Sequence, residues 1–245
     1  MNENLLQPTP FLALDIETGN AGIEDVEKTF ELFKPPANIK DPEKIQARME
    51  EKKEKMLDKA ALLDASPIIC IACRTDTGGV IFSSMNAEGL QIPQWELVIK
   101  EDEKTMLEAF REWADEVVMP ETIIAGHNCV NFDLPKIRNG FIRHRLQLPM
   151  FLLPALRGEI SVEVVDTMKL AKAFTMQYRD DFAISLDKLA DILSLPRPKQ
   201  AMSGADVPKA HERGEYAPIL VYCCIDTETT AEAAKLMLGI SNALY

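Results

Sequence analysis

The segment FLALDIETGN, residues 11–20, constrains the fold most strongly, because it places two acids at the end of an apolar run. The run itself is typical of a buried strand. Side chains two residues apart on a strand share a face, so Asp15 and Glu17 are expected to point the same way. Neighbouring carboxylates repel each other unless one is protonated, a basic residue pairs with them or a cation binds them. The motif contains no basic residue, and a distant arginine partner would make it purely structural.

The rest of the chain predicts strands first and then strands and helices in alternation. We expect strands in PIICIACRTD, GGVIFSSM, ETIIAG and SVEVVDTM, the first two joined as a hairpin across Gly78 and Gly79. Helical periodicity predicts helices in EDEKTMLEAFREWADEVV, FDLPKIRNGFIRHRL, SLDKLADILS and YAPILVYCCIDTETTAEAAKLML. This order indicates an α/β domain with a mixed β-sheet flanked by helices.

A long polar stretch, residues 20–66, follows the first strand. Its segment DPEKIQARMEEKKEKMLDKAALL predicts a surface helix with one apolar stripe, formed by Ile45, Met49, Met56, Ala60 and Leu63. Its basic residues could touch a nucleic acid, although a solvated charged face is favoured. The chain has 245 residues and no long Pro/Gly/Ser linker. We therefore expect one domain over residues 1–245, with 20–66 as a helical insertion after the first strand.

The net charge of −12 argues against a broad nucleic-acid-binding surface, because phosphate neutralisation needs clustered Lys and Arg. An acidic site that holds cations is still compatible with a phosphate substrate, since a divalent metal reverses the sign of the local field. The sequence has neither a signal-peptide pattern nor an apolar stretch long enough to cross a bilayer. We expect a cytoplasmic protein without membrane contact.

The five cysteines are odd in number and scattered, which argues against a disulfide framework. Cys70 and Cys73 have the CxxC spacing of zinc sites. However, they lie on a predicted strand, where residues three apart point to opposite faces. Reduced, buried thiols are therefore expected.

Two further motifs add acidic residues. Asp133 follows GHNCVNF at a predicted strand-to-helix junction, where it could equally be a helix cap, with Pro135 suited to the first turn. Tyr222 and Asp226 lie four residues apart in the last predicted helix and so share a face. Taken alone, such a pair is most often a hydrogen-bonded pair at the edge of a core.

The ordered set of motifs resembles the DEDDy branch of the DnaQ-like 3′–5′ exonucleases. It consists of Asp-x-Glu on the first strand, Asn-x4-Asp at the junction and Tyr-x3-Asp in the last helix. The resemblance spans residues 9–238, and MSGADVPKAHERGEYAPILVYCCIDTETT looks most like stand-alone relatives of the family B polymerase proofreading exonuclease domain. The sister DEDDh branch has a histidine five residues before the last Asp, where this chain has Val221.

The resemblance implies an RNase H-like fold and a two-metal hydrolysis of the terminal phosphodiester. Asp15, Glu17, Asp133 and Asp226 would bind two ions per site, Mg²⁺ or Mn²⁺ and not zinc, because these hard cations prefer oxygen ligands. One ion would help to deprotonate the attacking water and the other would stabilise the leaving 3′ oxygen. Tyr222 would position the water, since a phenol with a pKa of about 10 is a poor base at neutral pH.

The same resemblance suggests substrate contacts by Asn128, Phe132 and Thr18. Asn128 could instead tie down the strand-to-helix turn, and Phe132 could pack in the core. His127 is expected to be a packed or hydrogen-bonded residue. Asp166 could approach the metals, although capping the helix that follows is favoured.

Two polar regions could line the path of the substrate. The most basic part of the chain could guide a phosphate backbone or simply be solvated; it comprises Arg138, Arg143, His144, Arg145 and Arg157. The loop before the last helix, with Lys199, Ser203 and Gly204, would line the substrate groove by family analogy. The insertion is expected to pack over one edge of the site and to restrict what enters.

We therefore expect a metal-dependent 3′–5′ exonuclease that acts on single-stranded DNA or frayed 3′ ends and releases nucleoside 5′-monophosphates. A polymerase or a repair protein would be a compatible partner. A 3′–5′ exoribonuclease or oligoribonuclease uses the same chemistry, and no motif identifies a contact to the 2′-OH of RNA. A catalytically silent module that binds nucleic acid or a protein is the third alternative, although a scaffold would not need four converging acids.

Overall fold

The computed structural model describes residues 10–35, 37–152, 164–174, 183–196 and 202–240, so Arg157 and Lys199 lie outside the described residues. Within this part of the chain, six strands form one sheet in the order β4-β3-β2-β1-β5-β6. The strands are β1 (Phe11–Thr18), β2 (Ile68–Thr75), β3 (Gly79–Ser83), β4 (Trp95–Ile99), β5 (Ile123–Gly126) and β6 (Val164–Asp166).

The sheet is mixed, as the sequence predicts. The central strand β1 runs antiparallel to β2 and parallel to β5, and β6 continues the parallel side. The antiparallel pairing of β2 with β3 confirms the hairpin across Gly78 and Gly79. Strand β4, parallel to β3 at the sheet edge, was not predicted; its five residues are too short and too exposed for a strong strand pattern.

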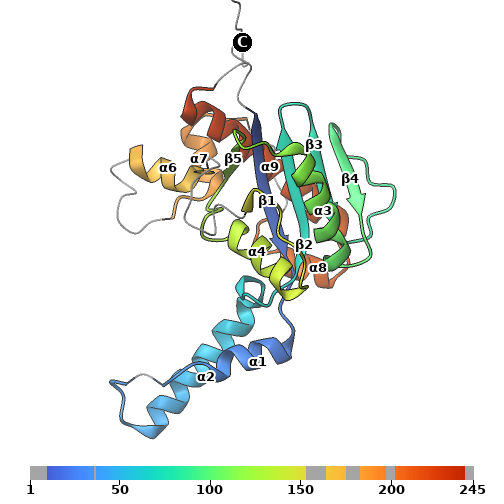
Figure 1. The fold of residues 1–245 in the computed structure, drawn as a ribbon. Coiled ribbons are helices and arrows are strands. Elements are labelled where there is room, and N and C mark those ends of the chain that lie inside the picture. Colours follow the sequence, from blue (N-terminus) through green and yellow to red (C-terminus); the bar gives the residue numbers. More distant parts are fainter. Residues whose placement is uncertain (1–9, 36, 153–163, 175–182, 197–201, 241–245) are drawn as a thin grey trace, which may run out of the picture.

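Helices cover both faces of the sheet (Figure 1). The described α-helices are α1 (Ile23–Glu31), α2 (Pro42–Asp58), α3 (Glu103–Val117), α4 (Asp133–Arg143), α6 (Thr167–Phe174), α7 (Leu186–Ile192), α8 (Val207–Glu212) and α9 (Tyr216–Leu238), of which α1 and α2 lie outside the sheet layers (Figure 1). The periodic segments predict α2, α3, α4, α7 and α9 correctly. Helices α1 and α8 lie in segments interpreted as polar stretches, because each is short and only one or two of its residues are buried.

The alternation of β1 decides which helices its side chains meet. Its even-numbered side chains join the core beneath α3 and α4, at Leu12, Leu14 and Ile16. Its odd-numbered side chains face α9, where Phe11 and Ala13 pack near Ala231 and Ala234. Asp15 and Glu17 continue this second set, so the acids of DIET point towards α9.

The insertion forms an arm of two helices that project away from the sheet (Figure 1). Helices α1 and α2 pack on each other through a small cluster that includes Val26 and Met56. The predicted stripe is confirmed at Met56, Ala60 and Leu63, whereas Ile45 and Met49 lie outside this cluster. Only the base of the arm adjoins the end of β1, where the Thr18 hydroxyl donates to the Ala61 carbonyl at 2.8 Å. The expectation that the insertion packs over one edge of the site is therefore wrong for its helices.

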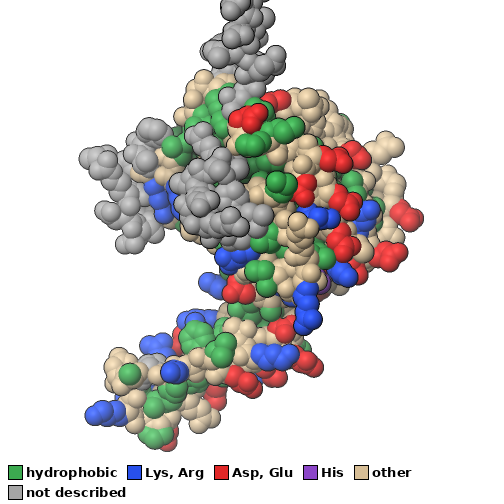
Figure 2. All heavy atoms as spheres, viewed as in Figure 1, with side chains coloured by type: hydrophobic (Ala, Val, Ile, Leu, Met, Phe, Trp, Pro, Cys, Tyr) green, Lys and Arg blue, Asp and Glu red, His purple; other side chains and the backbone are tan. Residues whose placement is uncertain are grey.

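The charges of the arm are mixed along its surface (Figure 2). Lys53 pairs with Glu27 at 3.3 Å, and Lys55 pairs with Glu51 at 2.6 Å. All four side chains are more than 40% exposed, so these pairs contribute little to stability. The arm therefore has a solvated charged face, as the sequence pattern favours.

All five cysteines are free and buried. Cys70 lies in the core beside α9, whereas Cys73 lies in the core beneath α3 and α4. The two CxxC side chains thus point to opposite faces of β2, as strand geometry requires. Among the described helices, none is long and apolar enough to cross a membrane.

Candidate active site

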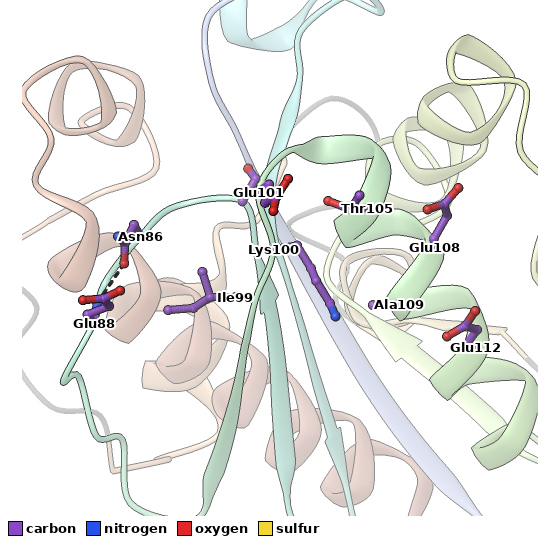
Figure 3. Close-up of a pocket in the computed structure, with 10 residues that line it drawn as sticks. Asn86, Glu88, Ile99, Lys100, Glu101, Thr105, Glu108, Ala109 and Glu112 are labelled. Carbon is purple, nitrogen blue, oxygen red and sulfur yellow. Dashed lines mark hydrogen bonds between the residues drawn. The ribbon is translucent and has the colours of Figure 1, made fainter.

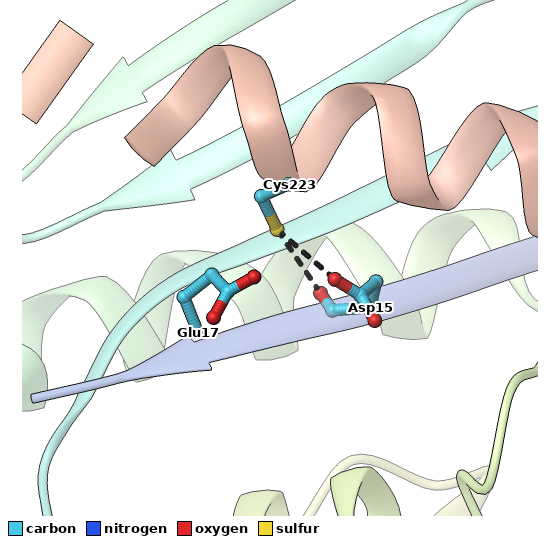
Figure 4. A group of neighbouring side chains, drawn as sticks. All are labelled: Asp15, Glu17 and Cys223. Carbon is cyan, nitrogen blue, oxygen red and sulfur yellow. Dashed lines mark hydrogen bonds between the residues drawn. The ribbon is translucent and has the colours of Figure 1, made fainter. Parts of the chain in front are cut away.

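Asp15 and Glu17 lie next to each other at the end of β1 and face helix α9 (Figure 4). Both are partly buried. The pairing of β1 with β2 shifts register between Glu17 and Thr18, and the chain then leaves the sheet for the arm. The two carboxylates are therefore held on a regular strand immediately before an irregularity. One oxygen from each and the Cys223 sulfur lie within 4.8 Å of one another.

Asp133 is the first residue of α4 and is buried at 3% exposure. Its Oδ1 accepts the backbone N–H of Ile16 at 3.1 Å, which joins residues 117 positions apart. The residue before it, Phe132, occupies the N-cap position without a side-chain capping bond. The alternative interpretation of Asp133 as the helix cap is therefore wrong, and its carboxylate lies beside the DIET segment instead.

Helix α9 brings Tyr222, Cys223 and Asp226 to the same place. It packs against β1, β2 and β5. The Cys223 Sγ lies 3.5 Å from Asp15 Oδ2, and the side chains of Tyr222 and Asp226 hydrogen-bond to each other. The structure thus brings together all five residues of the sequence motifs, from three elements that are distant in the chain.

Burial and mutual repulsion raise the pKa values of the acids on β1 and α4. Burial, followed by the charges of Asp133 and Asp226, raises the pKa of Asp15 well above its usual value. Burial and the charge of Asp15 do the same for Glu17. Burial also raises the pKa of Asp133 to about 7, although hydrogen bonds to its carboxylate oppose the change. These directions mean that the site disfavours its own negative charge.

A cation would relieve this repulsion, and the donor set fits one. Within the described residues, no lysine or arginine forms an ion pair with Asp15, Glu17 or Asp133. Buried carboxylates without such partners are costly, and they are commonly paired or bound to metals. Carboxylate oxygens are the ligands of hard divalent ions. Asp15, Glu17, Asp133 and Asp226 are the residues that could hold them.

Burial raises the pKa of Tyr222, and the charges of Asp226 and Glu17 raise it further. The phenol is therefore protonated at neutral pH and can donate a hydrogen bond. A Cβ at Gly204 would lie 3.6 Å from the Tyr222 hydroxyl. The loop before α9 thus approaches the site, as its family-like sequence predicts.

The loop between β5 and α4 is fixed by Asp166. Its Oδ1 accepts the backbone N–H groups of Asn128, Met168 and Lys169 at 3.1–3.2 Å, and its Oδ2 accepts that of Val130. This confirms the capping role of Asp166 at the start of α6 and adds a second role in the loop that leads to Asp133.

Asn128 has a left-handed backbone, with φ of 62°. Its side-chain oxygen accepts a hydrogen bond from Asn131 at 3.1 Å, and its carbonyl accepts the N–H of Phe132. These contacts favour the structural interpretation of Asn128. His127 bonds to Thr167 and to the Ile184 carbonyl, both at 2.9 Å, which confirms it as a hydrogen-bonded residue.

Two other candidates for substrate contact have roles within the fold. The Thr18 side chain is buried and bonded to Ala61, so a substrate contact by Thr18 would have to use its backbone. Phe132 is partly buried against the core beneath α4. The Lys136 ammonium lies over its ring, 5.9 Å from the ring centroid.

The basic end of α4 is occupied by protein contacts. Arg143 and His144 both bond to Glu103 at the start of α3, at 2.6 and 2.8 Å. Arg143 also donates to the Asp64 carbonyl at the base of the arm. This region joins α4 to its neighbours, and sequence reasoning had no signal for the Glu103 partner.

A hollow of about 790 Å³ lies away from these acids, beside the end of β4 and the start of α3 (Figure 3). The described residues that line it include Glu88, Glu101, Glu108 and Glu112 but a single lysine, Lys100. This charge would repel a phosphate, and the hollow lacks the converging groups of the β1 site.

Helix α8 and Cys223 are features of the site that the sequence interpretation missed. Asn20 donates to Glu212 at 2.7 Å, and a Cβ at Gly19 would lie 3.4 Å from His211, so α8 lies beside the DIETGN turn. Cys223 could have been found from helical spacing, because residues 223 and 226 are three apart and share a face.

Comparison with known proteins gives a family and a fold. Residues 68–231 match the sequence model of a family described as a predicted 3′–5′ exonuclease related to the exonuclease domain of PolB. The matched residues include Asp133, Tyr222 and Asp226, whereas Asp15 and Glu17 precede them. A search of curated proteins found no match.

The structure is similar to that of the family B DNA polymerase from the hyperthermophilic archaeon Pyrobaculum calidifontis, with a TM-score of 0.58 and 17% sequence identity. The match covers 97% of this chain and 25% of the polymerase chain, so this chain spans about a quarter of that protein's length. At this identity the likeness shows the fold alone, and it agrees with the RNase H-like mixed sheet expected from the sequence.

Proposed function

Because the chain belongs to the family of predicted 3′–5′ exonucleases related to the exonuclease domain of PolB, we propose that it is a metal-dependent exonuclease that hydrolyses the terminal phosphodiester at a 3′ end. Its substrate is single-stranded DNA or a frayed 3′ end, and its products are nucleoside 5′-monophosphates. The solved structure that it resembles is a DNA polymerase, which supports DNA over RNA.

The observation that carries this proposal is the meeting of acids from β1, α4 and α9 without a basic partner for Asp15, Glu17 or Asp133 among the described residues. If these acids had only a structural role, an arginine or a lysine would be expected to pair with them. A site that holds divalent cations needs the acids alone.

Each side chain has a role in the proposal. Asp15, Glu17, Asp133 and Asp226 hold two Mg²⁺ or Mn²⁺ ions. Bound ions of this kind supply an activated water and charge stabilisation at the leaving oxygen. Tyr222 keeps its proton, because burial and neighbouring acids raise its pKa. Its hydroxyl, which bonds to Asp226, orients the water by a hydrogen bond.

The substrate contacts follow from the loop that leads into α4. Phe132 lies immediately before Asp133 and is only partly buried, so its ring can meet the terminal base. Asn128 keeps its side-chain N–H groups for the sugar or phosphate while its oxygen holds Asn131. Thr18 would contribute its backbone at the end of β1.

The test is a 5′-labelled single-stranded DNA oligonucleotide incubated with purified protein and Mg²⁺ or Mn²⁺. Stepwise shortening with release of monophosphates is expected, and chelation should stop it. Asp226→Asn should lose at least about 10²-fold in rate. A matched RNA oligonucleotide separates the alternatives: faster shortening of RNA would make the protein an exoribonuclease. Shortening of neither strand would leave a module that only binds.

A further inference from the structure

Cys223 brings sulfur to a cluster that otherwise offers oxygen. Its side chain has no exposed surface, and its sulfur points from α9 towards Asp15 (Figure 4). We propose that Cys223, Asp15 and Glu17 form a site that captures a thiophilic divalent cation, Zn²⁺ or Cd²⁺, in competition with Mg²⁺. This inference rests on the proposed function in so far as Asp15 and Glu17 are metal ligands there.

The distances fit one ion. In tetrahedral zinc sites, Zn–S is about 2.3 Å and Zn–O about 2.1 Å, which places sulfur and oxygen about 3.6 Å apart. The Cys223 Sγ lies 3.5 Å from Asp15 Oδ2. The Glu17 carboxylate is the third donor, and all three ligand atoms lie within 4.8 Å of one another.

A second thiol, that of Cys70, lies beside Cys223 and adds another sulfur atom near the proposed metal site. Cys70 lies opposite Glu17 in the pairing of β1 with β2, and its side chain hydrogen-bonds with that of Cys223. Both thiols are free. Thiolate ligands select soft and borderline ions such as zinc, whereas Mg²⁺ gains nothing from sulfur. The expectation from the sequence that this site excludes zinc considered only the four carboxylates.

The binding step balances without an oxidant. The cation displaces the Cys223 thiol proton to solvent, and the thiolate donates an electron pair to the metal. Because the bound ion uses oxygens of Asp15 and Glu17, Mg²⁺ cannot use the same oxygens at the same time. A bound thiophilic ion would therefore prevent Mg²⁺ from binding to Asp15 and Glu17.

The test is a Cd²⁺ titration of the metal-free, full-length protein without nucleic acid, followed by the ultraviolet charge-transfer band of cadmium thiolate. The wild-type protein should develop the band, and added Mg²⁺ should raise the Cd²⁺ concentration that it requires. Cys223→Ser should lose the band, whereas the control Cys73→Ser should keep it, because Cys73 lies on the other face of β2. Circular dichroism checks that each variant is folded.

Glu17→Gln keeps every thiol and provides an independent variant. It should raise the dissociation constant for Cd²⁺ by roughly 10-fold or more, since even indirect partners of metal ligands contribute that much. No band in the wild-type protein, an equal band in a folded Cys223→Ser, or an unchanged affinity in Glu17→Gln would each overturn the inference. Because the titration contains no nucleic acid, it stands apart from the nuclease assay, and either result can fail alone.

Discussion

Asp133 accepts the backbone N–H of Ile16 through Oδ1 at 3.1 Å. This bond fixes the first residue of α4 against the centre of the DIET segment and fills one lone pair of a buried carboxylate. The bond therefore sets where the third acid lies relative to Asp15 and Glu17. An amide oxygen could accept the same bond without bringing the charge.

Substitution at Asp133 should separate these two roles. Asp133→Asn is expected to keep the bond to Ile16 and the stability of the fold, while the exonuclease rate falls by at least about 10²-fold because a metal-binding charge is lost. Asp133→Ala should lose the rate and also about 1–3 kcal/mol of unfolding free energy, because the Ile16 N–H is left buried and unpaired. Urea unfolding and the labelled-oligonucleotide assay measure both. Equal stability of the two variants would contradict this account.

The metal-free protein should become less stable as the pH rises from about 4 to about 7. The pKa of Asp133 is raised from its usual 3.8 to about 7 in the folded state, so in this range the folded state binds more protons than the unfolded state. The free energy of unfolding then falls with increasing pH. Thermal melts at several pH values check this, and Asp133→Asn should give a shallower dependence.

Added Mg²⁺ or Mn²⁺ should raise the melting temperature most at the upper end of this range, where the acids repel most strongly. A wild-type melting temperature that is insensitive to both ions at pH 7 would contradict the assignment of the metal ligands.

The core of the site was predictable because regular periodicity controls it. The alternation of β1 puts Asp15 and Glu17 on one face, and the spacing of α9 puts Tyr222 and Asp226 on another. The order of the motifs then indicates that the two faces meet. No local pattern contains the bond from Ile16 to Asp133, since it depends on how α4 docks against the sheet.

The features that were missed depend on tertiary contacts between short elements. Helix α8 has six residues, and its Glu212 is joined to Asn20 across most of the chain. The sequence made Arg143 a candidate phosphate contact, but the structure pairs its guanidinium with Glu103. The projection of the arm likewise follows from packing between α1 and α2, which no single-segment pattern encodes.

Tyr222→Phe should reduce kcat by roughly 10- to 10²-fold with little change in KM, because the variant loses the hydroxyl that bonds to Asp226 and positions the water. Burial and the neighbouring acids raise the pKa of this phenol, so the wild-type rate should show no inflection from its ionisation between pH 7 and pH 9. Tyr216→Phe, at the start of the same helix, is the matched control and should keep the wild-type rate. A pH profile with an inflection that disappears in Tyr222→Phe would instead make the tyrosine a base.

Asp166 should matter for the site without touching it. Its two oxygens hold the N–H groups of Asn128 and Val130 as well as the start of α6. Asp166→Asn replaces one acceptor oxygen by a donor, so about 1–3 kcal/mol of unfolding free energy should be lost. The loop that presents Asn128 should loosen, and KM for the oligonucleotide should rise.

Asp102→Ala provides the comparison for Asp166. Asp102 caps α3 by accepting the Thr105 N–H through its side chain at 2.8 Å, and the substitution removes this cap. That loss should cost about 1 kcal/mol of stability and leave KM unchanged, since this cap is remote from the loop before α4. If Asp166→Asn and Asp102→Ala lower stability and both keep the wild-type KM, the loop held by Asp166 does not position the substrate.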